Sequence, residues 1–222
     1  MEYRNLEEEL YDHPQVKEII SSVRSRLEKE KAARRKFYDW MTPERKAEFI
    51  NGEIIIHSPA RRGHVKATDH IVSLLLAYVT ENDLGWAGAE KNMVQLERND
   101  FEPDGAYWRK EIADTFDDDT VLYPAPDLVI EVLSKGTEER DRGIKFNDYE
   151  RAGVTEYWLV NYREKYIEQH QLVDGRYRLV GINKYRDRIK SVIVPGFEIP
   201  VAAAFDPQIY IREIRRGSHT IE

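Results

Sequence analysis

The chain has 222 residues, no cysteine and a formal net charge of −7, with 41% hydrophobic and 34% charged residues. This length allows one large domain, or a medium domain with an added arm, and the composition is typical of a folded, well-solvated protein. The missing cysteine excludes disulfides, thiolate nucleophiles and cysteine-built zinc sites, and the acidic charge argues against a protein that merely coats nucleic acid.

Signals for a membrane or for secretion are missing from the sequence. The longest apolar run, residues 71–79, is about half of what a transmembrane helix needs. No basic-then-apolar leader begins the chain. We therefore expect a cytoplasmic protein that has no membrane partner.

The first 36 residues are predicted to be an arm and a helix added to the main domain. Residues 1–13 are acidic and unpatterned, so we expect a loose arm there. From Pro14 onward, apolar residues recur at helical spacing and predict a helix with one apolar stripe. The stripe consists of Val16, Ile19, Ile20, Val23 and Leu27. Such a stripe is typical of a helix that docks on its own domain or on a dimer partner. The alternative is a contact with nucleic acid through the basic residues 34–36.

Residues 37–222 are predicted to form a single domain in which helices and strands alternate. The turn residues Asn51-Gly52 and Asp174-Gly175 each indicate a β-hairpin. The other expected elements are a helix (61–84), a hairpin (86–108), a buried strand (126–134), a helix (138–152), a strand (156–161), a strand region (189–201) and a terminal helix (207–216). This order predicts an α/β fold with a mixed sheet.

The strand "PAPDLVIEVLS", residues 124–134, carries two carboxylates among apolar residues. Alternation places Asp127, Val129, Glu131 and Leu133 on one face. Burying a carboxylate without a partner costs several kcal/mol, so Glu131 needs a cation or hydrogen-bond donors opposite it. Asp127 lies roughly 13 Å from Glu131 along the strand, and capping or bonding of nearby backbone is expected for it.

Asp104, which follows Pro103, lies on the strand that precedes this one. If the two strands are neighbours, Asp104 and Glu131 point toward one place, and a Mg²⁺ or Mn²⁺ ion between them would remove their repulsion. Lys145, on the next helix, can point back at the sheet and orient a water molecule or stabilise a phosphate. An ordinary solvated lysine is the alternative.

The sequence resembles the Uma-type putative restriction endonucleases, a bacterial family within the PD-(D/E)XK nuclease superfamily. The resemblance is carried by "PAPDLVIEVLSKGTEERDRGIKFNDYERAGVTEYWLVN" and, in the right order, by "EFINGEIIIHSPARRGH", "FEPD" and "SVIVPGFEI". It covers roughly residues 37–206. It implies a restriction-endonuclease-like mixed central sheet flanked by helices, to which this chain adds an N-terminal helix and C-terminal β-hairpins.

The family pattern also implies roles for individual residues. Asp104 matches the PD aspartate and Glu131 the acid of E-x-K, with the main-chain carbonyl of Val132 as a further metal ligand. Leu133 stands where the motif has lysine, which makes Lys145 the candidate for that role. Glu53 resembles an extra acid of some superfamily members, although a hairpin salt bridge is an equal alternative.

Other polar and aromatic residues of the pattern have simpler expected roles. His64 matches a family position near phosphate, together with Arg61 and Arg62, but a surface or capping role is favoured. The aromatic cluster of Tyr149, Tyr157 and Trp158 is expected to be core packing.

The function that the resemblance implies is a divalent-metal-dependent DNA endonuclease that hydrolyses phosphodiester bonds, leaving a 5′-phosphate. Its expected cofactor is Mg²⁺ or Mn²⁺, and its expected partners are duplex DNA and a second copy in a homodimer. A non-catalytic nucleic-acid-binding or scaffold module with the nuclease fold is the alternative, and RNA is an alternative substrate.

Overall fold

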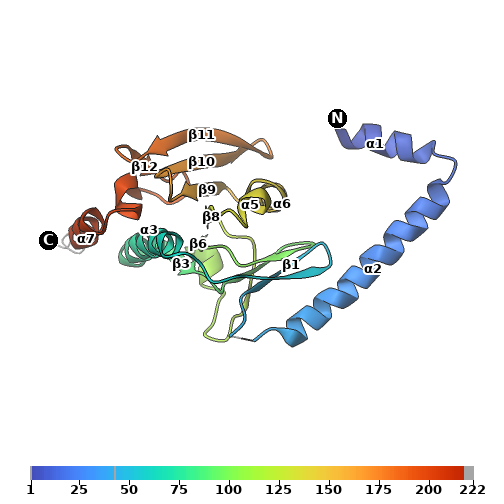
Figure 1. The fold of residues 1–222 in the computed structure, drawn as a ribbon, viewed down its shortest axis with the longest axis horizontal. Coiled ribbons are helices and arrows are strands. Elements are labelled where there is room, and N and C mark those ends of the chain that lie inside the picture. The colour runs from blue at the N-terminus through green and yellow to red at the C-terminus, as the bar shows by residue number, and fades with distance from the viewer. Residues whose placement is uncertain (1, 43, 218–222) are drawn as a thin grey trace.

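A computed structural model describes residues 2–42 and 44–217, and a six-stranded mixed sheet forms its centre (Figure 1). The strands lie in the order β11-β10-β9-β8-β6-β3. β8 and β9 are parallel, and the other neighbouring strands are antiparallel. In chain order they are β3 (Gly85–Ala89), β6 (Gly105–Arg109), β8 (Leu128–Val132), β9 (Glu156–Asn161), β10 (Tyr166–Val173) and β11 (Arg176–Lys184).

A second sheet of five short strands, in the order β2-β1-β5-β4-β7, packs beside the first. Its strands are β1 (Ala47–Ile50), β2 (Glu53–Ile56), β4 (Met93–Gln95), β5 (Asp100–Phe101) and β7 (Leu122–Tyr123). The predicted turn between β1 and β2 is confirmed, because Asn51 and Gly52 have φ angles of 50° and 89°, as a two-residue hairpin turn requires. Two hairpins follow near the C-terminus, as expected. One is β10–β11, and the other pairs β12 (Arg188–Lys190) with β13 (Glu198–Pro200).

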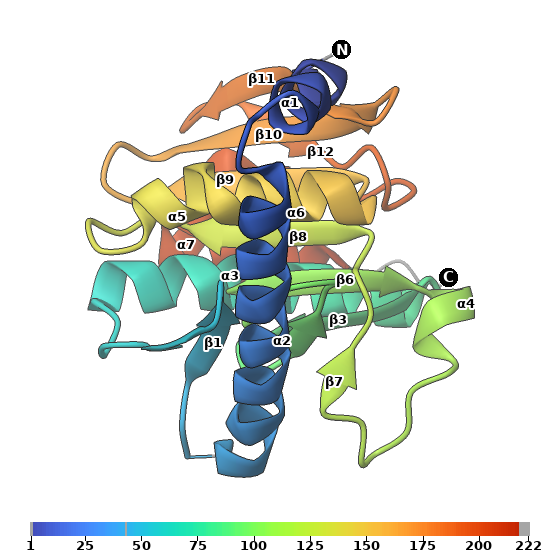
Figure 2. The ribbon, with the colours of Figure 1, turned by 90° about the vertical axis from the view of Figure 1, so that its right-hand side faces the viewer.

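Helices cover both faces of the central sheet (Figure 2). One face packs against α3 (Arg62–Glu81), the 3₁₀ turn η1 (Val201–Ala204) and α7 (Pro207–Gly217). The other face packs against α6 (Ile144–Ala152), which follows the short α5 (Glu138–Arg142). A further short helix, α4 (Lys110–Ala113), follows β6 directly. None of the described helices combines the length and apolarity that a membrane span needs.

The alternation predicted for β8 is confirmed by the two hydrophobic cores. Leu128, Ile130 and Val132 belong to the core that contains α3. Val129 and Leu133 belong to the core on the side of α6. The predicted packing role of Tyr149, Tyr157 and Trp158 is also confirmed, since all three are fully buried. Glu131 therefore points to the side of α6, as the sequence indicated.

Three predicted elements differ from the structure. The hairpin expected over residues 86–108 is divided between the sheets, with β3 and β6 in the central sheet and β4 and β5 in the second. The helix expected over residues 138–152 is broken at Gly143, but its start at Glu138 and its end at Gly153, with φ of 85°, are as predicted. Residues 2–11 form the helix α1 (Glu2–Tyr11), so the prediction of a loose arm was wrong. The acidic segment does have helical spacing, because Leu6 and Leu10 are four residues apart and the glutamates between them favour helix.

The long helix α2 (Val16–Trp40) runs from the domain into solvent (Figures 1 and 2). Its C-terminal half docks on the second sheet, where Phe37 is fully buried. Arg34 donates from Nε to Asp100 Oδ2 at 2.7 Å, and Tyr38 donates to Asp100 Oδ1 at 3.0 Å. The predicted boundary between residues 36 and 37 falls inside this helix. The stripe at Ile20, Val23 and Leu27 is 38–47% exposed, so the described residues leave it largely uncovered.

The Arg34–Asp100 pair is expected to hold α2 to the domain. Arg34→Ala leaves the buried Asp100 carboxylate without its cation, which should lower the free energy of unfolding by about 3 kcal/mol. Urea unfolding of the full chain measures this. Asp100→Asn in the Arg34→Ala background should recover part of the loss, because it removes the unpaired charge. A free energy of unfolding equal to that of the wild type in Arg34→Ala would show that the pair is not what docks α2.

Candidate active site

Asp104 immediately precedes β6 and links it to β8. Its Oδ2 accepts a hydrogen bond from the Val132 main-chain N–H at 2.8 Å and lies 3.1 Å from His64 Nε2. Its Oδ1 lies 3.7 Å from Lys46 Nζ. Burial raises the pKa of Asp104, but the hydrogen bond from His64 and the charges of His64 and Lys46 outweigh it and hold the pKa below its usual value. Asp104 is therefore a carboxylate at neutral pH.

Glu131 extends from β8 into the same place and is in a different electrostatic state. The side chain is buried, and its Oε1 lies 3.0 Å from Lys145 Nζ. Burial, together with the nearby carboxylates of Asp141, Asp104 and Glu48, raises the pKa of Glu131 well above its usual value despite the lysine. Asp104 and Glu131 come from the neighbouring strands β6 and β8, as the sequence predicted.

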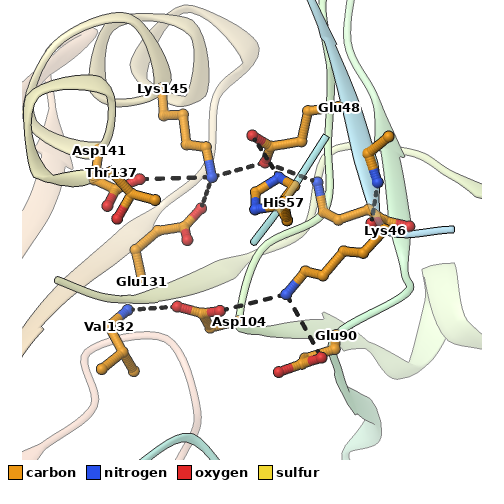
Figure 3. A network of polar contacts seen from close by, with 12 residues as sticks. Lys46, Glu48, His57, Glu90, Asp104, Glu131, Val132, Thr137, Asp141 and Lys145 are labelled. Carbon is orange, nitrogen blue, oxygen red and sulfur yellow. Dashed lines mark hydrogen bonds and ion pairs between the residues drawn. The ribbon is translucent and has the colours of Figure 1, made fainter. Parts of the chain in front are cut away.

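Lys145 is buried at the centre of the acidic cluster (Figure 3). Its Nζ lies 2.7 Å from Glu48 Oε1, 3.0 Å from Glu131 Oε1 and 3.5 Å from Asp141 Oδ1. Burial lowers the pKa of Lys145, but the three carboxylates outweigh it and raise the pKa well above its usual value. The lysine is thus an ammonium ion, and the alternative of an ordinary solvated lysine was wrong.

Two acids of this cluster, Glu48 and Asp141, were not predicted. Glu48 lies on β1, is fully buried, and accepts a hydrogen bond from the Glu102 N–H at 3.1 Å. Burial raises its pKa, but Lys145 and His57 outweigh burial and lower the pKa to about 2. A signal was available, since Glu48 interrupts the apolar run "AEFI" as Glu131 interrupts its own strand. Asp141 had no such signal, because acids are common in the first turn of a helix.

His64 differs from its favoured interpretation. A surface or capping role was expected, but the side chain is buried and contacts Asp104. Burial lowers the pKa of His64, yet the hydrogen bond with Asp104 and its charge outweigh this and raise the pKa. His64 and the Val132 N–H therefore contact the same carboxylate oxygen, Oδ2 of Asp104.

The three remaining predicted residues lie on different strands or beside them. They are Asp127, Glu53 and Val132. Asp127 accepts a hydrogen bond from the Arg109 N–H at 2.8 Å, so the structural role expected for it is confirmed. The exposed Glu53 lies on β2 and lines a groove with Arg98, away from the acidic cluster. Val132 ends β8 and uses its N–H to hold Asp104.

A cleft of about 700 Å³ opens over the cluster, and Asp104, Glu131, Asp141 and Lys145 are part of its lining. Four cationic side chains also line this cleft: Arg61, Lys135, Arg140 and Arg163. Within residues 2–42 and 44–217, these four make no ion pair with a carboxylate, in contrast to Lys46 and Lys145. The cleft therefore has an acidic, ion-paired interior and free positive charges elsewhere on its wall. We call these four residues the cationic rim.

The residues of the cleft suit a hard divalent cation. Three buried carboxylates, those of Glu48, Glu131 and Asp141, surround the buried ammonium group of Lys145, and the buried Asp104 lies beside them. Burial, together with the charges of the other acids, raises the pKa of Glu131. In the described part of the chain, no three His, Asp or Glu side chains form a ready-made metal cage. Mg²⁺ does not need one, because it takes one or two protein carboxylates and keeps several waters.

Comparison with known proteins agrees with the geometry. A family model described as Uma2, putative restriction endonuclease, matches residues 34–202. The chain is similar in fold to the crystal structure of a putative nuclease belonging to DUF820 from Anabaena variabilis ATCC 29413. The two share 15% identity, with 76% of this chain and 94% of that chain covered and a TM-score of 0.65. A search of curated proteins finds no match. The predicted family resemblance and fold are confirmed.

The charge of Glu131 is expected to destabilise the folded protein in the absence of a divalent ion. Its pKa in the folded state is raised, so the folded state binds more protons than the unfolded state above about pH 4.5, and stability falls as pH rises. Glu131→Gln removes this loss. In EDTA its melting temperature should exceed that of the wild type, by about 2–4 °C for each kcal/mol gained. The difference should be larger at pH 8 than at pH 5. A difference that does not change with pH would contradict the assignment.

Proposed function

Because the chain belongs to the Uma2 family of putative restriction endonucleases, we propose that it is a divalent-metal-dependent DNA endonuclease. The observation that carries this proposal is the buried Lys145 among three carboxylates, beside Asp104 on an open cleft. Burying this many charges costs folding free energy. Clusters with strongly shifted pKa values in a cleft are typical of sites that do chemistry.

Asp104 and Glu131, with the Val132 carbonyl, are the groups that would hold Mg²⁺ or Mn²⁺. When bound, such an ion lowers the pKa of a water molecule and neutralises charge that develops on a phosphate. Asp104 is already ionised, since His64 and Lys46 stabilise its charge. Glu131 holds a proton more tightly, so that proton competes with the ion. Metal binding should therefore strengthen as pH rises.

Lys145 supplies the positive charge that the E-x-K motif expects two residues after Glu131. Leu133 is buried at that position in the core on the side of α6. Lys145 reaches Glu131 from α6 instead, and it lines the cleft. Its ammonium group can orient an attacking water molecule or stabilise a phosphate in the transition state. Glu48 and Asp141 fix its position.

The substrate proposed is DNA, and the cationic rim is the support for it. Arg61, the pair Lys135 and Arg140, and Arg163 come from three parts of the chain and line the cleft that holds the acids. Free cations beside a site that cleaves a phosphodiester can neutralise the neighbouring phosphates. A local group of this kind is what a chain with a net charge of −7 needs to bind a polyanion.

The alternative is a non-catalytic module that keeps the nuclease fold. The missing lysine at Leu133 and the acidic net charge favour it. The missing lysine is weak support, because the Lys145 ammonium group lies 3.0 Å from Glu131 and supplies the charge from another element. RNA is an alternative substrate, since the rim recognises phosphate and not the sugar.

We further propose that the protein acts as a homodimer on duplex DNA in the cytoplasm. The support for a dimer is the uncovered apolar stripe of α2 at Ile20, Val23 and Leu27. A second copy would bring a second cleft to the opposite strand, so that both strands could be cut in one binding event.

The catalytic assignment is tested by cleavage of supercoiled plasmid and single-stranded DNA with Mg²⁺ or Mn²⁺. We expect cleavage by the wild type and a loss of at least about 100-fold in Asp104→Ala, Glu131→Gln and Lys145→Met. Glu53→Gln is the matched control and should retain activity, because that side chain lies outside the cleft. A wild type that cuts neither DNA would favour the non-catalytic alternative. An Asp104→Ala that cuts as fast as the wild type would overturn the assignment of catalysis to this site. RNA offered in the same assay tests the choice of substrate.

The role of the cationic rim is tested by DNA binding in EDTA, where no cleavage occurs. Arg61→Ala with Arg163→Ala should weaken binding and make the slope of log K against log salt shallower by about 2, one for each lost phosphate contact. Arg215→Ala with Arg216→Ala removes equal charge from α7, outside the cleft. Fluorescence anisotropy with a labelled duplex measures both. Equal effects of the two pairs would mean that only net charge matters.

A further inference from the structure

The arm formed by α1 and the N-terminal half of α2 takes no part in the cleft. Figures 1 and 2 show α2 leaving the domain and α1 lying at its far end. Apolar side chains on both helices are exposed: Leu6 by 62%, Ile20 by 38%, Val23 by 47% and Leu27 by 39%. A chain normally covers apolar residues that recur on one helix face.

One face of α2 runs through both of its halves. Its residues alternate in steps of four and three, which is the spacing of a coiled-coil seam. The seam consists of Val16, Ile20, Val23, Leu27, Glu30, Arg34 and Phe37. The last three bind the domain, through Arg98, Asp100 and the core. The first four continue the same seam beyond the domain, so this face is built for a partner along its whole length.

Two five-residue segments of the arm have the same apolar spacing and opposite charges. Residues 6–10 read L-E-E-E-L, and residues 23–27 read V-R-S-R-L. In each, two apolar residues four apart have a like charge on either side, and residues 6–10 carry a third acid, Glu8, on the opposite face of the helix. Glu7 and Glu9 flank the first pair, and Arg24 and Arg26 flank the second. In residues 2–42 and 44–217, none of these four charges has an ion pair within the chain.

These charges decide which helix can cover the seam. A second copy of α2 packed with its own residues 23–27 on this segment would bring Arg24 and Arg26 against the same arginines, and like charges at flanking positions repel. The α1 helix contains four glutamates and one arginine, a net charge of −3, and offers the opposite sign. The partner that fits residues 23–27 by apolar spacing and by charge is therefore an α1 helix.

The α1 helix of the same chain is in the wrong register to be that partner. If α1 folded back on α2 about the turn at residues 12–15, residues 6–10 would meet the first turn and a half of α2. Residues 23–27 lie about six positions further on, which is about 9 Å along a helix. An α1 from another molecule has no such restriction. A groove beside this seam, lined by Val23, Leu27 and the β1–β2 turn at Asn51 and Gly52, is open to it.

We propose that two copies of this chain exchange their arms, with α1 of each copy packed on the α2 seam of the other. Leu6 and Leu10 cover Val23 and Leu27, while Glu7 and Glu9 pair with Arg24 and Arg26. The exchange is reciprocal, so one two-fold axis satisfies both contacts. This inference rests on the proposed homodimer and specifies its interface, but it does not depend on nuclease activity.

The experiment measures the molar mass of the full chain by light scattering at several concentrations. The wild type should approach about 52 kDa, twice the chain mass of 26.2 kDa. Glu7→Arg with Glu9→Arg should be a monomer, and so should Arg24→Glu with Arg26→Glu. An equimolar mixture of these two double variants should form a dimer again, because every exchanged contact then has opposite charges. This rescue cannot arise within one molecule.

Glu8→Arg with Glu18→Arg is the matched control. It changes the net charge as much as Glu7→Arg with Glu9→Arg does, but on the faces of α1 and α2 that point away from the proposed contact, so the dimer should stay intact. A wild type that stays monomeric, or a mixture that stays monomeric, would overturn the exchange. A dimer that survives both seam variants would keep the homodimer and reject this interface. Plasmid cleavage by the same samples is scored separately, so loss of nuclease activity is not confused with loss of the dimer.

Discussion

The buried ammonium group of Lys145 is the interaction on which the site and much of the domain depend. It joins Glu48 on β1, Glu131 on β8 and Asp141 on α5, and so connects the two sheets to the helix pair that covers them. Without this cation, three carboxylates would share a space from which water is largely excluded, and their repulsion would separate these elements. The second sheet is therefore tied to the central sheet by the same charge that the proposed chemistry uses, in addition to the hydrophobic core that the two sheets share.

The surroundings shift the pKa values of the two proposed metal-binding carboxylates in opposite directions. Asp104 receives the Val132 N–H and lies beside His64, so it stays ionised. Glu131 shares its one cation with two other acids, and burial raises its pKa. An ion entering the cleft would meet one carboxylate whose charge is stabilised and one, Glu131, for which protons compete with the ion. The folded protein stores this unfavourable charge at the site, a common trade between stability and function.

The sequence predicted the parts of the site that interrupt an apolar pattern. Glu131 and Asp104 were found because a carboxylate in or beside a buried strand needs a partner, and Lys145 because the family pattern leaves its lysine position to Leu133. Glu48 gave the same signal in "AEFI" and was overlooked in favour of Glu53, five residues later on the exposed strand. Asp141 and the burial of His64 depend on how α5 and α3 pack, which local spacing does not determine. The helix α1 is not predicted, because a short acidic segment with only two leucines gives a weak helical signal.

The arm and the cleft belong to different parts of the chain, yet a short connection joins them. The family match begins at residue 34, so α1 and most of α2 lie outside it. After α2 ends at Trp40, the chain enters β1, which carries Glu48, and the preceding Lys46 contacts Asp104. Docking of α2 through Arg34 and Phe37 therefore fixes the base of the arm against the sheet that contains part of the site. A partner held by the arm would be held in a defined orientation to the cleft, and that is what paired cleavage of two strands needs.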